Sequence, residues 1–330
     1  MRSKNPTSLI LLSFMYITDT TKTMTMAISP SPLESGKFTG DLSAEIDGIS
    51  NGLPAISATT AAELPTKLAE TTHNPIQYEE EELEAMRNVR TQLIEKHKID
   101  PNRIGLKTLA LTTIVTKLRV EEAASKYATY LEMVGACGVA SLHDEAVLTM
   151  SHEKLKKLQN RLDSYATCGP DSQGRSIMWV KGQKEAYPVE EETEIVTAAI
   201  MYHTAIHADA LSLRKGITFI IDTSQKPAKK AKNDQKLQKT WQAMPMRPQT
   251  MLIAGASLPL RVVINSLIAV ASLFTKQKVL DRIKFVKIQD AFDSVPKTSA
   301  PAYLGGGGGG IEDIVQWTKQ RIDNFPAPNL

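Results

Sequence analysis

The sequence predicts an α/β protein in which a small helical unit precedes a lobe built on a mostly parallel sheet. Residues 216–222 (Gly-Ile-Thr-Phe-Ile-Ile-Asp) form a nearly continuous apolar run, which is typical of a strand buried on both faces. From residue 165 onward strand-like and helix-like segments alternate, whereas residues 77–164 carry helical patterns alone. The 42% hydrophobic content supports a substantial core, and the formal net charge of +3 is too balanced to indicate a nucleic-acid partner.

Residues 1–76 are expected to be a disordered leader outside the fold. Residues 8–17 are strongly apolar and follow Arg2 and Lys4, but this run is too short to span a bilayer, which needs about 20 residues. A targeting segment and a dispensable or wrongly assigned start both remain open interpretations. The Ser, Thr, Pro and Gly content of residues 29–75 predicts disorder, because such a segment cannot bury enough apolar surface to fold.

The helical unit, residues 77–164, is expected to contain four helices and no motif that carries chemistry. Acidic residues at 79–82 favour a helix N-terminus there, since they complement the helix dipole. The predicted helices cover residues 78–97, 104–118, 120–135 and 150–162.

The lobe, residues 165–304, is expected to contain four strands separated by helices. The predicted strands are 176–180, 216–222, 250–255 and 283–288, and the predicted helices are 189–211, one ending near Trp241, 259–274 and 275–282. Residues 305–330 are expected to form a flexible linker of six glycines and a last helix, 311–324.

The helix predicted at 259–274 is the most informative segment. Ser257 and Pro259 are suited to its first turn. One face collects Leu260, Val263, Ile264, Leu267, Ala271 and Phe274, while the opposite face is also largely apolar. Such a helix needs apolar surroundings on both sides. Basic residues follow it at Lys276, Lys278, Arg282 and Lys284.

Several motifs occur in an order that resembles the CRAL-TRIO family of lipid-transfer proteins. They are Asp171-x-x-Gly174-Arg175, the strand 216–222, Met244-Pro-Met-Arg247, Ala254-Gly-Ala256 and Ala300-Pro-Ala-Tyr-Leu-Gly-Gly306. The resemblance covers residues 100–310 and implies a cavity for one lipid, floored by the sheet and closed by residues 259–274, hereafter the gate helix. It also implies transfer between membranes without catalysis, a cytoplasmic and membrane-peripheral protein, and no cofactor apart from the bound lipid.

The candidate site has two parts. The lipid pocket is expected to be lined by Trp179, Met201, Ile217, Phe219, Ile221, Ile253, Ile264, Leu267, Ile268, Ala271 and Phe274, although core packing would explain any one of them equally well. Membrane or phosphoinositide headgroup contact is expected from Arg247, Lys276, Lys278 and Arg282, against the alternative of solvated helix ends. Met246 stands where phosphatidylinositol-binding members carry Glu, so the resemblance leaves that ligand open.

Other interpretations are weaker but not closed. His203 and His207 have a spacing that can hold zinc but lack the Glu of the protease motif, and no metal site is expected. The glycine run lacks the Lys of a phosphate loop. An α/β scaffold without a ligand is the main alternative function, and an enzyme using Asp222 is the lesser one. Cys137 and Cys168 indicate free thiols in a reducing compartment.

Overall fold

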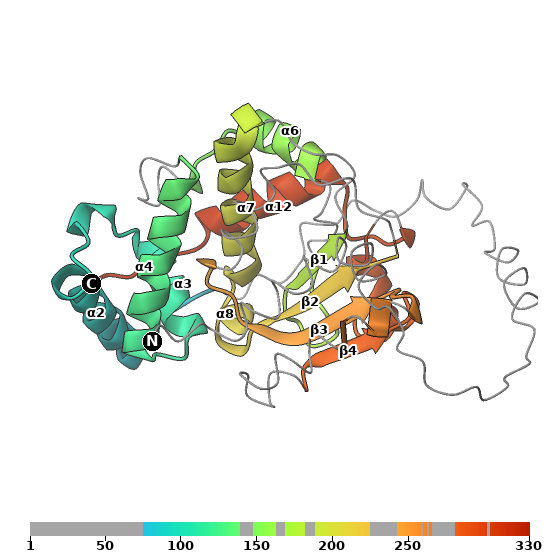
Figure 1. Cartoon of the computed structure of the whole chain (residues 1–330), viewed down its shortest axis with the longest axis horizontal. Helices are drawn as coiled ribbons and strands as arrows, with labels where there is room; N and C mark the ends of the chain where they lie inside the picture. Colours follow the sequence, from blue (N-terminus) through green and yellow to red (C-terminus); the bar gives the residue numbers. More distant parts are fainter. Residues whose placement is uncertain are drawn as a thin grey trace, which may run out of the picture.

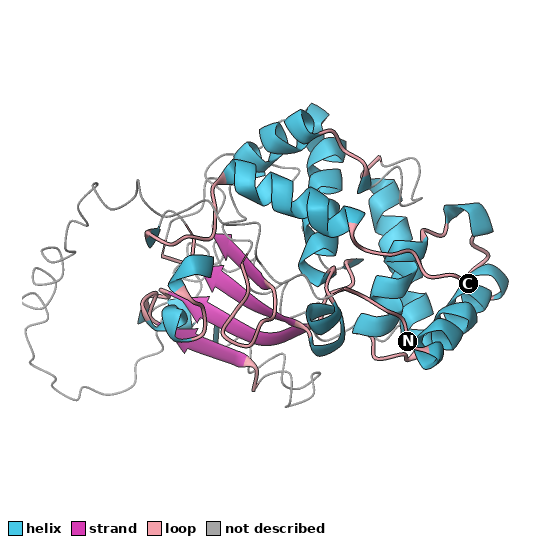
Figure 2. Ribbon diagram, turned by 180° about the vertical axis from the view of Figure 1, so that it is seen from behind, coloured by secondary structure: helices cyan, strands magenta, loops and turns pink. Residues whose placement is uncertain are grey.

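The computed structural model describes residues 75–138, 148–162, 169–181, 189–224, 243–258, 260–262, 264–265, 281–301 and 304–330. Most of the predicted leader therefore lies outside the described residues, as do most of the gate helix and the helix predicted near Trp241. The described chain has helices at one end and a parallel sheet at the other, with helix α7 between them (Figure 1). Seen from behind, the strands again gather on one side (Figure 2).

The helical unit contains α2 (Glu80–Glu95), the 3-10 turn η3 (Pro101–Arg103), α3 (Leu106–Val115), α4 (Val120–Ala136) and α6 (His152–Leu162). Local signals set its boundaries. The Glu79 N–H donates to the Glu82 carboxylate at 3.1 Å, which satisfies one free donor at the start of α2. Between α3 and α4 the backbone is left-handed at Lys117 and Leu118, and this turn reverses the chain. Helix α2 packs against both α3 and α4.

The sheet has the order β1-β2-β3-β4, and every neighbouring pair is parallel. Its strands are β1 (Ile177–Lys181), β2 (Ile217–Asp222), β3 (Pro248–Ala254) and β4 (Ile283–Val286). The prediction of an α/β lobe with a mostly parallel sheet is confirmed. The 3-10 turns η5 (Asp290–Asp293) and η6 (Lys297–Ser299) follow β4, and α12 (Ile311–Asp323) is the last helix.

The helix predicted at 189–211 is divided in two. A 3-10 turn, η4 (Val189–Glu191), leads into α7 (Glu192–His207), and α8 (Ala210–Lys215) follows after a break. The break lies at Asp209, whose carboxylate accepts hydrogen bonds from the N–H groups of Leu211 (3.0 Å) and Ser212 (2.9 Å). An Asp that caps a new helix in this way ends the preceding one, so the prediction of one continuous helix was wrong here.

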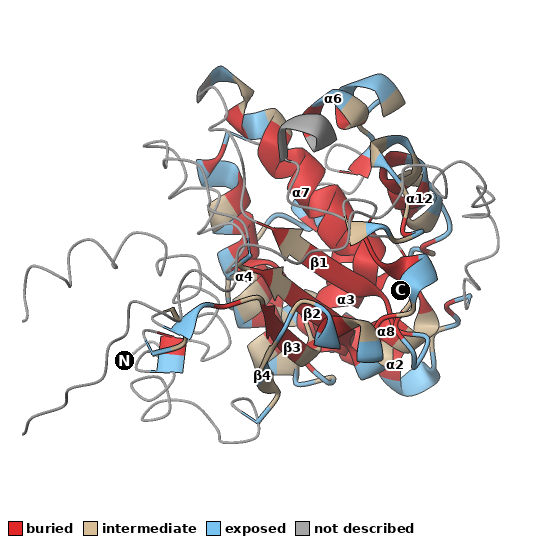
Figure 3. Cartoon of the chain, turned by 90° about the vertical axis from the view of Figure 1, so that its right-hand side faces the viewer, coloured by how far each residue is buried: buried red, intermediate tan, exposed pale blue. Residues whose placement is uncertain are grey.

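Successive side chains along each strand point to opposite faces of the sheet, and this produces two apolar layers. The larger layer, hereafter the α7-side core, unites Met178, Phe219 and Ile253 with α7 and with residues of the helical unit such as Leu109 and Tyr127. The smaller layer, hereafter the outer core, contains Ile177, Trp179, Ile220, Leu252, Ala254, Ala291, Val295 and Ala300. The helical unit and the lobe thus share one core, and burial runs continuously through α7 and the central strands (Figure 3).

Helix α12 and the tail after it tie the lobe to the helical unit. Trp317 packs near Tyr202 of α7, with ring centroids 6.2 Å apart. Farther along, the Lys107 ammonium donates to the Ile322 carbonyl at 2.8 Å, and the Tyr78 hydroxyl donates to the Pro326 carbonyl at 2.7 Å. The chain therefore ends beside α2 (Figures 1 and 2).

Candidate functional site

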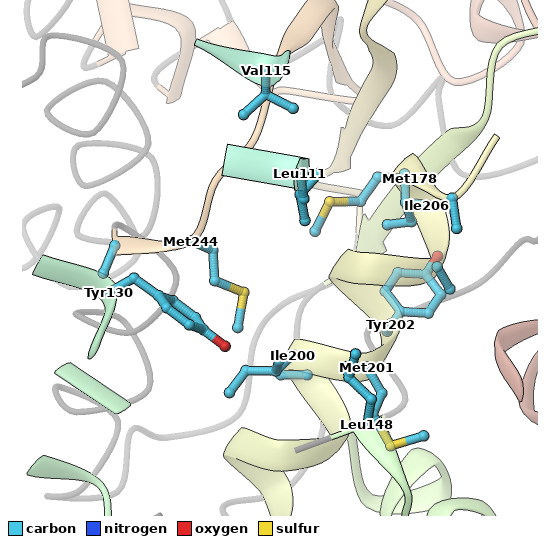
Figure 4. Packing of buried hydrophobic residues seen from close by; sticks show 14 of the residues in the cluster. Leu111, Val115, Tyr130, Leu148, Met178, Ile200, Met201, Tyr202, Ile206 and Met244 are labelled. Carbon is cyan, nitrogen blue, oxygen red and sulfur yellow. The ribbon is translucent and has the colours of Figure 1, made fainter. Parts of the chain in front are cut away.

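Most of the predicted pocket residues that the structure describes lie together on the α7 side of the sheet. Met201, Ile217, Phe219, Ile253 and Ile264 are buried members of the α7-side core, and Ile221 packs against it. They come from α7, two strands and the start of the gate helix. The same layer contains several methionines, and Figure 4 shows Met178, Met201 and Met244 among its side chains. Unbranched methionines adapt to differently shaped neighbours, so they fill irregular spaces within this core.

Trp179 lies on the opposite face of the sheet from this group. It belongs to the outer core, where its ring centroid is 6.3 Å from that of Phe292. The reason is the alternation of side chains along a strand, because Met178 already points to the α7 side. The sequence prediction grouped Trp179 with the pocket because the direction of β1 relative to α7 has no signal in the sequence.

The gate helix begins as predicted, directly after the carboxyl end of β3. The Arg261 N–H donates to the Ser257 carbonyl at 2.9 Å, which is the first helical hydrogen bond. Apolar side chains lie on both sides of this start: Leu258 is 77% exposed and Val262 is 66% exposed, whereas Ile264 is only 1% exposed. The other predicted gate residues (Leu267, Ile268, Ala271 and Phe274) and the cations Lys276 and Lys278 lie outside the described residues.

The two remaining predicted cations, Arg247 and Arg282, both lie at the amino edge of the sheet. Arg247 directly precedes β3, and Arg282 directly precedes β4. The Arg282 guanidinium donates to the Pro248 carbonyl at 3.0 Å, and the Arg247 guanidinium donates to the Arg214 carbonyl at the end of α8. Burial lowers the pKa of Arg247, and the positive charges of Arg282 and Arg119 lower it further.

Arg119 contributes one of these charges. It occupies the N-cap position of α4, where its side chain makes no capping hydrogen bond. A cation at a helix N-terminus is disfavoured by the helix dipole. Its guanidinium is held by the Glu122 carboxylate at 2.7 Å and by the Thr116 carbonyl at 2.9 Å.

The family-like motifs have structural roles in this chain. The Asp171 carboxylate accepts hydrogen bonds from the N–H groups of Gln173 and Arg175, both at 2.8 Å, and it pairs with the Arg175 guanidinium at 2.8 Å. These bonds shape the turn that leads into β1. The Asp222 carboxylate, on which the enzyme alternative depended, accepts a hydrogen bond from the Ser224 N–H at 2.9 Å and so holds the turn after β2. Met246 is half-buried and packs against the α7-side core.

The paired histidines are buried parts of α7. The His207 Nδ1 lies 3.0 Å from the His203 carbonyl, and its Nε2 accepts a hydrogen bond from the Arg247 N–H at 3.4 Å. Both ring nitrogens of His207 are thus engaged. Burial lowers the pKa of His203 well below its usual value and lowers the pKa of His207 to about 4. Among the described residues, no group of three or more His, Cys, Asp or Glu side chains could hold a metal ion.

Within the described ranges, no helix combines the length and the apolar character needed to cross a membrane.

Comparison with known proteins identifies the lobe. No curated protein matches the chain. Residues 161–306, however, match the family model of the CRAL/TRIO domain, and this span contains the turn at Asp171, all four strands and the gate helix. Residues 161–306 therefore form a CRAL/TRIO domain, and proteins with this domain generally bind and transfer lipophilic ligands without catalysis.

Proposed function

We propose that this protein binds one hydrophobic lipid or lipophilic small molecule on the α7 side of its sheet and transfers it between membranes. The observation that carries the proposal is the start of the gate helix, where Leu258 and Val262 are exposed while Ile264 is buried. Exposed apolar area is favourably covered at about 25 cal/mol per Å². A membrane surface can cover the outer side of the helix, and the inner side lies on the α7-side core.

The composition of the α7-side core supports the ligand part of this proposal. Aliphatic and methionine side chains predominate in the core around Met201, Phe219 and Ile253. A surface of this kind selects its ligand by shape and apolar area rather than by hydrogen bonds. It is suited to an acyl chain, a polyprenyl chain or a fused-ring lipid.

The membrane part of the proposal is supported by the connection between β3 and β4. Because these strands are parallel, the connection must return from the carboxyl edge of the sheet, beside Leu258, to the amino edge, beside Arg282. The connection thus joins the exposed side chains of Leu258 and Val262 to the cations that lie before and at Arg282. Lys276 and Lys278 belong to this connection, and each cation near an anionic membrane surface contributes about 1 kcal/mol. Both kinds of membrane contact would then come from one segment.

Transfer assays with surface variants test the proposal. Replacing Leu258 and Val262 with Asp should lower the rate of lipid transfer between liposomes about tenfold or more, because both side chains would resist entering the membrane interface. The amount of lipid bound per chain should not change. The matched control is Leu330→Asp, since Leu330 is also an exposed large apolar residue but lies at the chain end. Equal transfer rates for the double variant and the control would contradict the proposed membrane contact.

A further inference from the structure

Strand β4 lies at an edge of the sheet that the described part of the chain forms (Figure 1). Within that part it pairs with β3 on one side and with no strand on the other. The Arg282 and Val286 carbonyls accept hydrogen bonds from N–H groups of β3 and of the residue after it, at 2.9 and 3.1 Å. Because backbone groups alternate in direction along a strand, those of Ile283 and Phe285 point away from β3. β4 therefore presents hydrogen-bonding groups that can pair with a further strand.

The two edge strands of the sheet differ in how far they are covered. Four of the five residues of β1 are buried. In β4, by contrast, Ile283, Phe285 and Val286 are half-buried and Lys284 is exposed. Ile283 and Phe285 pack against the α7-side core, whereas Val286 packs against the outer core, so Lys284 lies on the outer face with Val286. Such an edge is complementary to a strand with one apolar face and one acidic face.

Residues 41–47 of the leader (Asp-Leu-Ser-Ala-Glu-Ile-Asp) have this pattern. In a strand their side chains would alternate between an apolar face and a face with three acids, namely Leu42, Ala44 and Ile46 against Asp41, Ser43, Glu45 and Asp47. Gly40 and Gly48 bound the run, as glycine often bounds a strand. A segment that cannot fold by itself can gain order by pairing its backbone with an existing sheet edge.

Charge and reach favour this segment over other occupants of the edge. A second copy of the chain would bring its own Lys284 and Arg282 to the same seam, and like charges across a seam are unfavourable. The more apolar run 8–17 has no acidic residue to meet Lys284. Residues 48–74 span up to about 90 Å when extended. They are therefore long enough to reach β4 from residue 75, where the described chain begins.

We propose that residues 41–47 add to the edge of β4 as a further strand, with Glu45 beside Lys284 on the outer face. The apolar side chains of the added strand then continue the α7-side core beyond Ile283 and Phe285. This face assignment is the same for a parallel and an antiparallel strand, because it is centred on Glu45. The leader thereby covers the edge at which the connection containing the gate helix enters the sheet. The inference does not rest on a bound ligand.

Hydrogen exchange of the full chain, measured by mass spectrometry on peptides that cover β4, tests the proposal. The Ile283 and Phe285 amides should exchange slowly, because the added strand accepts their hydrogen bonds. Glu45→Lys should speed this exchange about fivefold, which corresponds to the upper range for one cross-strand charge pair. Glu34→Lys is the matched control, since Glu34 is an acidic residue of the leader outside 41–47, and it should leave the exchange unchanged.

A charge swap then tests the partner of Glu45. Lys284→Glu alone should also speed exchange of the β4 amides about fivefold. Combining it with Glu45→Lys should restore slow exchange, because the swap re-forms a pair of opposite charges. Lys284 is exposed, so its replacement leaves the core intact, and circular dichroism of each variant checks that it has folded.

Other outcomes would overturn the added strand. Exchange of the β4 amides at the rate of an unstructured peptide would mean that the edge is free. If Glu45→Lys and Glu34→Lys exchanged alike, or if the double variant exchanged as fast as the single ones, residues 41–47 would not be the occupant. Protection that increased with protein concentration and did not respond to Glu45→Lys would assign the edge to a second copy of the chain.

Discussion

At the scale of single residues, His207 predicts how stability depends on pH. Burial is the main reason that its pKa falls to about 4, and the nearby charges of Arg321 and Arg247 add to this effect. An unfolded histidine titrates near pH 6.5, so the unfolded chain takes up the proton first as the pH falls. The contribution of His207 to the free energy of unfolding is therefore fully present above about pH 6.5. This contribution decreases by about 3 kcal/mol as the pH falls toward 4.

Denaturant unfolding between pH 7.5 and pH 5 measures this effect. His207→Gln should lower stability at pH 7.5 but should show a smaller decrease between the two pH values than the wild-type chain. His97→Gln serves as the control, because His97 is a partly exposed histidine near the end of α2. If the pH dependence were the same in all three proteins, His207 would not be the buried neutral group described above.

Lys126 gives a second prediction at this scale. Burial lowers its pKa to about 8, against an opposing effect of Glu122. The folded chain therefore bears a cost for keeping this amine charged at neutral pH. Lys126→Met keeps the length of the side chain and removes the charge, and it should stabilise the protein by roughly 1 kcal/mol at pH 7. The gain should shrink as the pH rises through about 8 to 10, because the wild-type amine loses its proton in the folded chain over this range. Thermal unfolding of both proteins across this range measures the gain. A gain that stayed constant would contradict the prediction.

At the scale of elements, the glycine run differs from the predicted flexible linker. Its backbone is docked on the segment around η6: the N–H groups of Gly306, Gly307 and Gly308 donate to carbonyls of residues 297–301. A Cβ on Gly306 would lie 2.3 Å from the Ala300 carbonyl oxygen, so this position needs glycine because the two backbones approach closely. The run positions α12 for its contacts with α6 and α7.

This packing makes Gly306→Ala informative. We expect it to destabilise the chain by about 1–3 kcal/mol, because the added methyl group must displace backbone. Gly310→Ala should have little effect, since the nearest atom to its added Cβ is the Asp313 carboxylate oxygen at 3.8 Å. Thermal unfolding of the two variants measures the difference. Equal melting temperatures would indicate that the run is a free linker after all.

The elements themselves could largely be predicted from the sequence, because their signals are local. The apolar run of β2, the acidic start of α2 and the Asp-Pro break before η3 each belong to a few neighbouring residues. The break between α7 and α8 also had a local signal, the capping Asp209, but the apolar period on both sides of it favoured one helix. Trp179 could not be assigned locally, since its neighbour Phe292 comes from far along the chain.

At the scale of the whole molecule, the α7-side core joins the helical unit to the CRAL/TRIO lobe. Leu109 and Tyr127 of the unit share this core with Phe219 and Ile253 of the sheet. An ion pair also joins the two parts: the Arg214 guanidinium of α8 lies 2.7 Å from the Glu82 carboxylate of α2. The two parts therefore stabilise each other, and a ligand held on the α7 side would be sensed by both.

The central claim is that this chain carries one lipophilic ligand, and lipid analysis of the purified full-length protein tests it most directly. The protein would be incubated with mixed liposomes and reisolated, and its bound lipid would then be extracted and quantified by mass spectrometry against the protein concentration. We expect one lipid class to be enriched over the liposome composition, at about one molecule per chain. A reisolated protein that is free of lipid, or that carries lipid only in the proportions of the liposomes, would contradict it.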